Sequence, residues 1–122
     1  MIVLDTNVII YYSQNDPKVV RWTEQEIKQG TLFVISTMSV VELLSFPNVS
    51  LRETFLIERV LRSARVIDVD MSHAREAARL RIRYGLKAID AVIAATASIF
   101  DIPLASRDKI FSKLTELNLI DL

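Results

Sequence analysis

The stretch from Ala88 to Phe100 constrains the fold more than any other part of the chain. It is a run of Ala, Ile, Val, Thr, Ser and Phe that contains a single charged residue, Asp90. Because a helix that is apolar on all sides has to be buried, this segment predicts a helix packed inside a domain. A length of 122 residues is the size of one domain, so we expect a single domain over residues 1–122.

Short apolar segments alternate with helical segments along the rest of the chain. Further helices are expected at residues 17–29, between Ser36-Thr37 and Phe46-Pro47, at 51–63 and at 71–84. Buried strands are expected at residues 2–4, 32–35, 66–69, 103–105 and 118–122. This alternation predicts an α/β fold, with a central parallel sheet of about four to five short strands flanked by helices.

The composition excludes several kinds of functional site. The chain has no Cys, which excludes disulfides, Cys-ligated zinc, iron–sulfur clusters and thiol catalysis. Its one histidine, His73, cannot build a His-rich metal site, and we expect it to have a surface or capping role. Any bound metal would therefore be a hard cation with oxygen ligands. No apolar run is long enough to span a bilayer and no signal peptide is visible, so we expect a cytoplasmic protein without a membrane partner.

Four acidic residues stand at positions where a ligand site or an apolar side chain is expected. Asp5 and Asp108 follow the strands at 2–4 and 103–105, and ligands of parallel sheets bind outside the carboxyl ends of strands. Glu42 lies on the helix after the second strand, and Asp90 is the lone charge of the buried helix. Burying an ionised carboxylate costs several kcal/mol unless a charge compensates it. Mg²⁺ or Mn²⁺ would compensate it, and would activate water at a phosphodiester.

Each of these acids also has a plainer interpretation when it is considered alone. Asp5 and Asp90 are both candidates for helix caps, since each stands near the start of a helical segment. Glu42 is compatible with an exposed position on its helix, and Asp108 with an ordinary loop. The occurrence of all four in one small chain favours the metal site.

Four short motifs that contain these acids resemble those of PIN-domain ribonucleases. They are Leu-Asp-Thr-Asn at 4–7, Val-Glu-Leu-Leu at 41–44, Ala-Ile-Asp-Ala-Val-Ile-Ala-Ala-Thr-Ala at 88–97 and Ala-Ser-Arg-Asp at 105–108. Their order and spacing cover essentially the whole chain. The chain is also similar in size to the VapC-type toxins of prokaryotic toxin–antitoxin pairs. The resemblance implies a parallel sheet flanked by helices, with the acids at one end of the sheet.

The resemblance also implies roles for individual residues. Thr6 matches the hydroxyl next to the first acid and Asn7 a supporting polar position, while Ser106 stands where the family often has Thr. The acids that match the family's Mg²⁺ or Mn²⁺ ligands are Asp5, Glu42, Asp90 and Asp108.

The activity implied by the resemblance is metal-dependent endonucleolytic cleavage of RNA. Asp5, Glu42 and Asp90 would hold the metal that orients a water for attack on the phosphodiester. Asp108, together with Ser106, would complete the site or hold a second ion. The number of ions and the RNA target are left open.

Partners follow from the same resemblance. Lys87 and Arg107, which lie close to the acids in sequence, are candidates for contact with the RNA backbone. A toxin would be held inactive by an antitoxin whose segment covers the acidic groove, and would form a homodimer. Val19, Val20 and Trp22 are candidates for the antitoxin contact or for ordinary core packing.

Charge is distributed unevenly, although the 15 basic and 15 acidic residues cancel. Residues 52–87 contain 9 Arg or Lys against 5 Asp or Glu. In this segment Arg75, Arg79 and Arg83 form a stripe, which is either a solvated face or a surface for phosphate or an acidic partner. The zero net charge therefore excludes a strongly basic, non-specific nucleic-acid binder, but it does not exclude RNA.

Several rival functions share parts of this pattern. A haloacid-dehalogenase-type phosphotransferase needs a second Asp two residues after the first, where this chain has Asn7. A receiver-like phosphoacceptor domain needs paired acids at the end of the first strand, where this chain has only Asp5. A PIN-domain nuclease for housekeeping RNA processing and a catalytically silent PIN-fold binding module both remain open.

Overall fold

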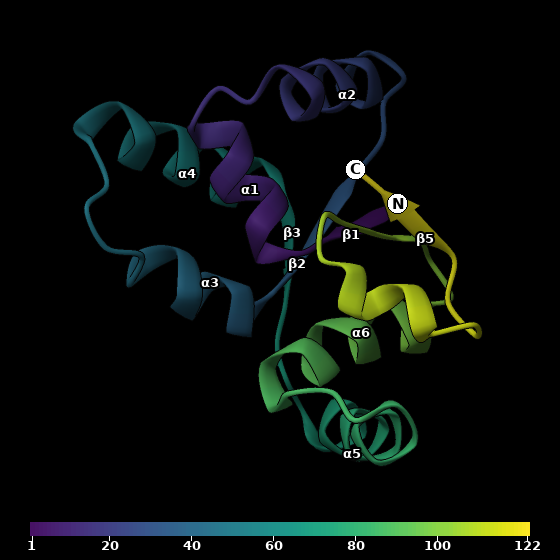
Figure 1. Ribbon diagram of the computed structural model, residues 1–122. Helices are drawn as coiled ribbons and strands as arrows, with labels where there is room; N and C mark the ends of the chain where they lie inside the picture. The colour runs from purple at the N-terminus through teal and green to yellow at the C-terminus, as the bar shows by residue number, and fades with distance from the viewer.

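Five short strands form one parallel sheet in the computed structural model, which describes residues 1–122 (Figure 1). Their order across the sheet is β3-β2-β1-β4-β5, and every neighbouring pair is parallel. In the register, Val3 of β1 pairs with Val34 of β2 on one side and with Leu104 of β4 on the other. The strands are β1 (Ile2–Leu4), β2 (Phe33–Ser36), β3 (Arg65–Ile67), β4 (Leu104–Ser106) and β5 (Leu119–Asp121). The predicted parallel sheet of four to five strands is confirmed.

Six α-helices and one 3-10 helix connect the strands. They are α1 (Thr6–Ser13), α2 (Pro17–Lys28), α3 (Thr37–Leu44), α4 (Leu51–Ser63), α5 (Met71–Tyr84), α6 (Ala88–Phe100) and the 3-10 helix η1 (Lys109–Lys113). Helices α4, α5 and α6 begin and end at the predicted residues. The local reasons are visible at α5, where the Asp70 side chain accepts the backbone N–H of His73 and Gly85 adopts φ 67° at the end.

The sequence pattern did not predict the 3-10 helix η1 or the bounds of helix α1. This helix begins directly after β1, without a loop, and its middle contains the β-branched residues Val8, Ile9 and Ile10. Such residues favour strands when they are considered locally. Burial of Val8 and Ile9 against the sheet overrides this preference.

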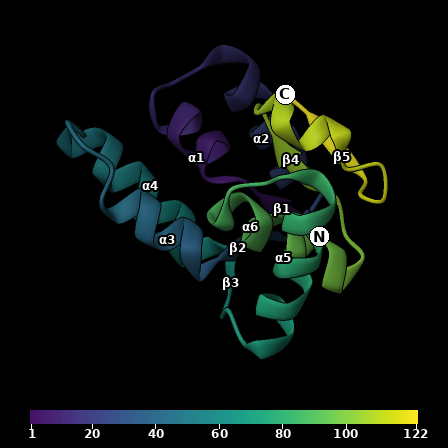
Figure 2. The ribbon, with the colours of Figure 1, turned by 60° about the horizontal axis from the view of Figure 1, so that its bottom comes forward.

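The helices cover the sheet on both faces (Figures 1 and 2). Alternate strand residues supply two separate apolar clusters. Val3, Val34 and Leu104 pack with α5 and α6 on one face, whereas residues such as Leu4 and Ile35 pack with α1, α2 and α4 on the other. The result is a three-layer α/β/α arrangement.

Helix α6 occupies the interior position predicted for it. Its central residues Ile93, Ala94 and Ala95 have no exposed surface. The helix is not buried on all sides at its end, however, because Ile99 and Phe100 are each 39% exposed. The prediction is thus confirmed for the middle of the helix and wrong for its exposed first residue, Ala88, and its last two residues.

His73 is buried, which corrects the expected surface or capping role. It lies in the first turn of α5, is 4% exposed, and its ring packs against Phe100 with centroids 6.3 Å apart. Its Nδ1 lies 2.9 Å from Oδ1 of Asp70, and it is Asp70 that caps the helix. Burial follows from the position of His73 on the face of α5 that packs against α6.

The strand order places a crevice beside β1. From β1 the chain moves to β2 and β3 on one side, and later returns to β4 on the other side of β1. In open α/β sheets, ligands bind where the strand order reverses in this way, outside the carboxyl ends of the strands. Asp5 follows β1 and Ser106 ends β4, so both lie at this point.

No helix of the molecule is both long and apolar enough to cross a bilayer.

Candidate active site

One open pocket of about 360 Å³ collects all four of the predicted acidic residues. They come from four segments that are far apart in sequence: the end of β1, helix α3, the first turn of α6 and the residue before η1. Thr6 and Asn7 also line this pocket. The acids are Asp5, Glu42, Asp90 and Asp108.

Asp5 is the most buried of the four acids, with 5% of its surface exposed. The Ser106 hydroxyl donates to its Oδ2 at 2.7 Å, and its backbone N–H donates to the carbonyl of Ala105 at 3.0 Å. Burial raises the pKa of Asp5 to about 6, and the nearby carboxylates of Asp90 and Glu42 add to this effect. The hydrogen bond from Ser106 opposes it. Asp5 is therefore a carboxylate that a cation would stabilise in its ionised form.

Ser106 joins the ends of β1 and β4. Besides donating to Asp5, its Oγ accepts the backbone N–H of Asp108 at 2.9 Å and the Asn7 side-chain amide at 3.5 Å. Asn7 in turn accepts the backbone N–H of Arg107 at 3.3 Å through its Oδ1. These bonds hold two of the acids and one supporting polar residue in a fixed relation to each other.

Glu42 is tied to the first motif by a hydrogen bond across the pocket. The Thr6 hydroxyl donates to Glu42 Oε1 at 2.7 Å. Glu42 is half-buried, so it is not simply an exposed residue of its helix. Helix α3 places it there because the Ser36 side chain caps the helix directly after β2.

Asp90 and Asp108 differ in how they are held. Asp90 lies in the first turn of α6 but does not cap it, because the cap position is Lys87. Burial raises the pKa of Asp90, and the carboxylates of Asp108 and Glu42 add to this effect. Asp108 is exposed, and its Oδ1 accepts the backbone N–H of Ile110 at 2.9 Å, so it does cap the 3-10 helix η1.

The two cations proposed to contact substrate are in different situations. Lys87 is exposed, and its charge lowers the pKa of Asp90, although burial outweighs this effect. The Arg107 guanidinium is occupied within the molecule: its Nη1 donates to Asp16 at 2.7 Å, and its Cζ lies 4.4 Å from the centroid of the Tyr11 ring. The structure thus leaves Lys87, and not the Arg107 side chain, free for a substrate.

The carboxylate oxygens of the pocket suit a hard divalent cation that keeps part of its water shell. Mutually repelling carboxylates with raised pKa values are what a cation would neutralise. No three acidic or histidine side chains of the structure are close enough together to hold an ion in common. Mg²⁺ is usually held by one or two carboxylates and several waters, so the pocket meets this requirement without three direct ligands.

Sequence reasoning missed the apolar part of the pocket. Ile10, Phe46 and Pro47 line it together with the acids, as does Ser45. In the sequence, Phe46 and Pro47 indicate only the end of a helix. The one sequence signal for their place in the pocket is that they follow Glu42 within five residues. This signal becomes informative only when α3 is known to run along the pocket.

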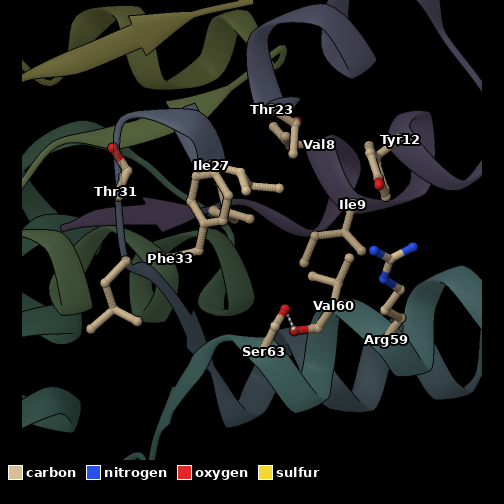
Figure 3. A pocket seen from close by; sticks show the side chains of 13 residues that line it. Val8, Ile9, Tyr12, Thr23, Ile27, Thr31, Phe33, Arg59, Val60 and Ser63 are labelled. Atoms are coloured by element: carbon tan, nitrogen blue, oxygen red, sulfur yellow. Dashed lines mark hydrogen bonds between the residues drawn. The ribbon is translucent and has the colours of Figure 1, made fainter. Parts of the chain in front are cut away.

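A second pocket, of about 380 Å³, shares no residue with the acidic one (Figure 3). It lies between α1, α2, β2 and α4 and is mostly apolar, with Ile9, Phe33 and Val60 in its lining. Arg59 is its one charged residue, and the exposed Ile27 and Leu32 contribute to it.

The candidate partner residues and the arginine stripe are largely used inside the molecule. Val19 is fully buried and Trp22 packs against Phe33, with ring centroids 5.9 Å apart, so both belong to the core. In the stripe, Arg79 and Arg83 both form ion pairs with Glu116. That pairing leaves only part of the stripe free for a partner.

Comparison with known proteins gives one family and a consistent set of structures. The family model described as the PIN domain matches residues 2–117. Among curated proteins, no sequence matches this chain significantly. Among solved structures, the chain is similar to VapBC2 from Rickettsia felis bound to a promoter DNA fragment, with a TM-score of 0.82 at 21% identity. That alignment covers 99% of this chain and 98% of the other.

Two further structures extend this comparison. DNA-bound VapBC from Salmonella typhimurium aligns with a TM-score of 0.82 at 22% identity, over 98% of this chain and 96% of the other. FitAcB from Neisseria gonorrhoeae aligns with a TM-score of 0.75 at 26% identity, over 99% of this chain and 97% of the other.

Proposed function

This chain belongs to the PIN-domain family, and on that premise we propose that it is a metal-dependent endoribonuclease that hydrolyses RNA phosphodiester bonds. The observation that carries the proposal is the convergence of Asp5, Glu42, Asp90 and Asp108 on one open pocket at the reversal of strand order. A surface-exposed or capping role for all four acids would not require them to share a pocket.

The pocket residues divide the work in this proposal. Asp5, Glu42 and Asp90 would hold Mg²⁺ or Mn²⁺, one or two of them directly and the remainder through bound water, with Asp108 at the exposed rim. When bound, such an ion activates water and stabilises the charge that develops on a phosphodiester. Two hydrogen bonds support these ligands: Ser106 donates to Asp5, and Thr6 donates to Glu42.

These supporting contacts have a chemical purpose. The hydrogen bond from Ser106 lowers the pKa of Asp5 and so favours the ionised form that a cation needs, and the bond from Thr6 fixes the orientation of Glu42. Asn7 supports Ser106 from the side of α1. Lys87, which is exposed near Asp90, would contact a phosphate of the RNA backbone.

We propose further that the chain is the toxin of a toxin–antitoxin pair and acts in the cytoplasm. Support comes from the similar structures, which include VapBC complexes and a toxin–antitoxin complex from Klebsiella pneumoniae that aligns with a TM-score of 0.80. A cognate antitoxin would cover the acidic groove, and the apolar pocket between α1, α2, β2 and α4 offers additional surface for a protein partner (Figure 3). A homodimer is part of the same proposal.

An RNA cleavage assay tests the enzymatic proposal. Wild type is compared with Asp5→Asn, Asp90→Asn and the matched control Asp101→Asn, which changes an exposed acid at the other end of α6. We expect cleavage with Mg²⁺ or Mn²⁺ in wild type and the control, and none in the two pocket variants or in EDTA. Cleavage that EDTA and both pocket substitutions leave unchanged would refute the metal site.

A growth assay distinguishes a toxin from a housekeeping PIN-domain nuclease and from a catalytically silent PIN-fold binding module. Expression of the wild-type chain should arrest growth, and co-expression of the neighbouring open reading frame should relieve the arrest. A housekeeping nuclease would cleave RNA without arrest, and a catalytically silent binding module would show neither effect.

A further inference from the structure

Phe46 is the one aromatic residue that lines the acidic pocket. It stands directly before Pro47, and the residue before a proline is disfavoured in helical conformation. The chain accordingly leaves α3 after Leu44, and Asn48, with φ 59°, turns it towards α4. The helix end thus places an aromatic side chain at the rim of a site that is otherwise acidic.

The packing of Phe46 leaves part of its ring available. Its side chain is only half-buried and lies between two hollows. One, of about 210 Å³, lies between α3 and α4 and is bordered by Leu43, Val49 and Ile57. The other is the acidic pocket itself, where Ile10 and Pro47 provide neighbouring apolar surface. Phe46 is therefore not fully used by the core.

We propose that Phe46 is a stacking platform for an unpaired nucleobase next to the bond to be cleaved. This inference rests on the function proposed above and assigns to Phe46 the contact with one base of the RNA substrate. A base paired in a duplex does not offer its face to a side chain, whereas an unpaired base stacks on aromatic rings. Stacking also needs no positive charge, which suits a pocket whose polar wall consists of carboxylates.

The charge distribution supports this mode of binding. Around the pocket, Lys87 is exposed but the Arg107 guanidinium is bound to Asp16. The lining of the pocket contains no Lys or Arg, so a contact that does not depend on charge would supply part of the affinity for RNA. Phe46 with Pro47 is the surface in the pocket that provides such a contact.

Two substitutions at Phe46 and one control at Phe55 test the platform in the Asp90→Asn background, where turnover is prevented. Phe46→Leu keeps an apolar side chain and removes the ring, Phe46→Tyr keeps the ring, and Phe55→Leu removes an aromatic residue on α4 that is 60% exposed and outside the pocket. The probe is a short single-stranded oligoribonucleotide that contains 2-aminopurine, whose fluorescence is quenched by stacking. We expect Phe46→Leu to weaken binding about tenfold and to lose quenching, with Phe46→Tyr and Phe55→Leu unchanged.

A second readout uses the wild-type chain and needs no substitution at Phe46. The NMR ring-proton resonances of Phe46 should shift when the same oligonucleotide is added, and those of Phe55 should not. Equal binding and quenching in Phe46→Leu, unshifted Phe46 resonances, or equal affinity for duplex and single-stranded RNA would overturn the inference. Base stacking on Phe46 in a chain that cleaves no RNA would support the stacking contact and refute the proposed nuclease, whereas cleavage without stacking would refute the contact alone, so the two failures are distinguishable.

Discussion

Asp5 shows at the scale of a single residue how burial disfavours the ionised form of a carboxylate. Its carboxylate is almost fully buried, and its pKa is raised to about 6 chiefly by that burial. The Ser106 hydrogen bond reduces this effect without removing it. A buried carboxylate with a raised pKa is a candidate for function, because the uncharged amide of an asparagine would be accommodated more easily in the same place.

The first prediction concerns the stability of the metal-free protein. A folded-state pKa above the ordinary value of 3.8 means that the folded chain binds the proton more tightly than the unfolded chain. Wild type should therefore lose about 2 kcal/mol of unfolding free energy, relative to Asp5→Asn, as the pH rises from 4 through about 6 to 7.5. Urea unfolding in EDTA at several pH values measures this, with Asp101→Asn as the control. Parallel pH profiles for wild type and Asp5→Asn would contradict it.

Ser106 carries the second prediction. Its hydroxyl bonds Asp5, Asp108 and Asn7 at once, so Ser106→Ala removes the side-chain donor to the Asp5 carboxylate and leaves the Asp108 N–H without its partner. We expect cleavage activity or Mg²⁺ affinity to fall by roughly 10–100-fold. Ser106→Thr keeps the hydroxyl and should retain most activity, and Ser112→Ala, at an exposed serine of η1, should change nothing. Full activity in Ser106→Ala would show that this hydrogen-bond network does not position the site.

The identity of the acidic residues could be predicted from the sequence, but the contacts of some residues around them could not. Asp5, Glu42 and Asp90 were identifiable because charges interrupt apolar segments, and the structure does bring them together. The internal pairing of Arg107 with Asp16 was not predictable, because the two residues are 91 positions apart and no local pattern connects them. The burial of His73 was missed for a similar reason, since it depends on how α5 packs against α6.

At the scale of elements, caps and periodicity determine most of the helices. Ser50, Asp70 and Ser36 each accept a backbone N–H at a helix start, and Gly85 ends α5 with a positive φ. Such signals are local and therefore visible in the sequence. The bounds of α1 were not visible, because tertiary packing there overrides the local preference of β-branched residues.

Helix α6 carries the third prediction. Ala94 has no exposed surface in the layer between α5 and the sheet, so Ala94→Leu adds volume where there is no space. We expect it to lower the unfolding free energy by about 1–3 kcal/mol. Ala88→Leu, at the exposed first residue of the same helix, should change it by about 0.5 kcal/mol or less. Thermal or urea unfolding of the two variants gives the comparison, and equal stabilities would mean that the interior position of α6 is wrong.

For the whole molecule, the zero net charge is a sum over basic and acidic groups in different environments. Several arginines are bound internally, as in the pairs of Arg79 and Arg83 with Glu116 and of Arg107 with Asp16. Acids without such partners gather in the pocket. No Lys or Arg lines this pocket, so an RNA phosphate placed there would be accepted more readily with a bound metal ion.

The fourth prediction follows from this distribution. Because no Lys or Arg lines the pocket, substrate binding there should release few counterions. The logarithm of 1/KM for RNA cleavage should fall with the logarithm of salt concentration with a slope shallower than about −2, at constant Mg²⁺. A much steeper slope would indicate an extended basic binding surface instead.

Direct measurement of Mn²⁺ binding tests the central claim, that the four acids form a divalent-cation site. Calorimetric titration of wild type should show binding that Asp90→Asn weakens at least about tenfold, the size of effect expected when one carboxylate of a coupled site is lost. The control Asp101→Asn, on the same helix but outside the pocket, should bind as wild type does. No binding to wild type, or equal binding to Asp90→Asn, would contradict the account.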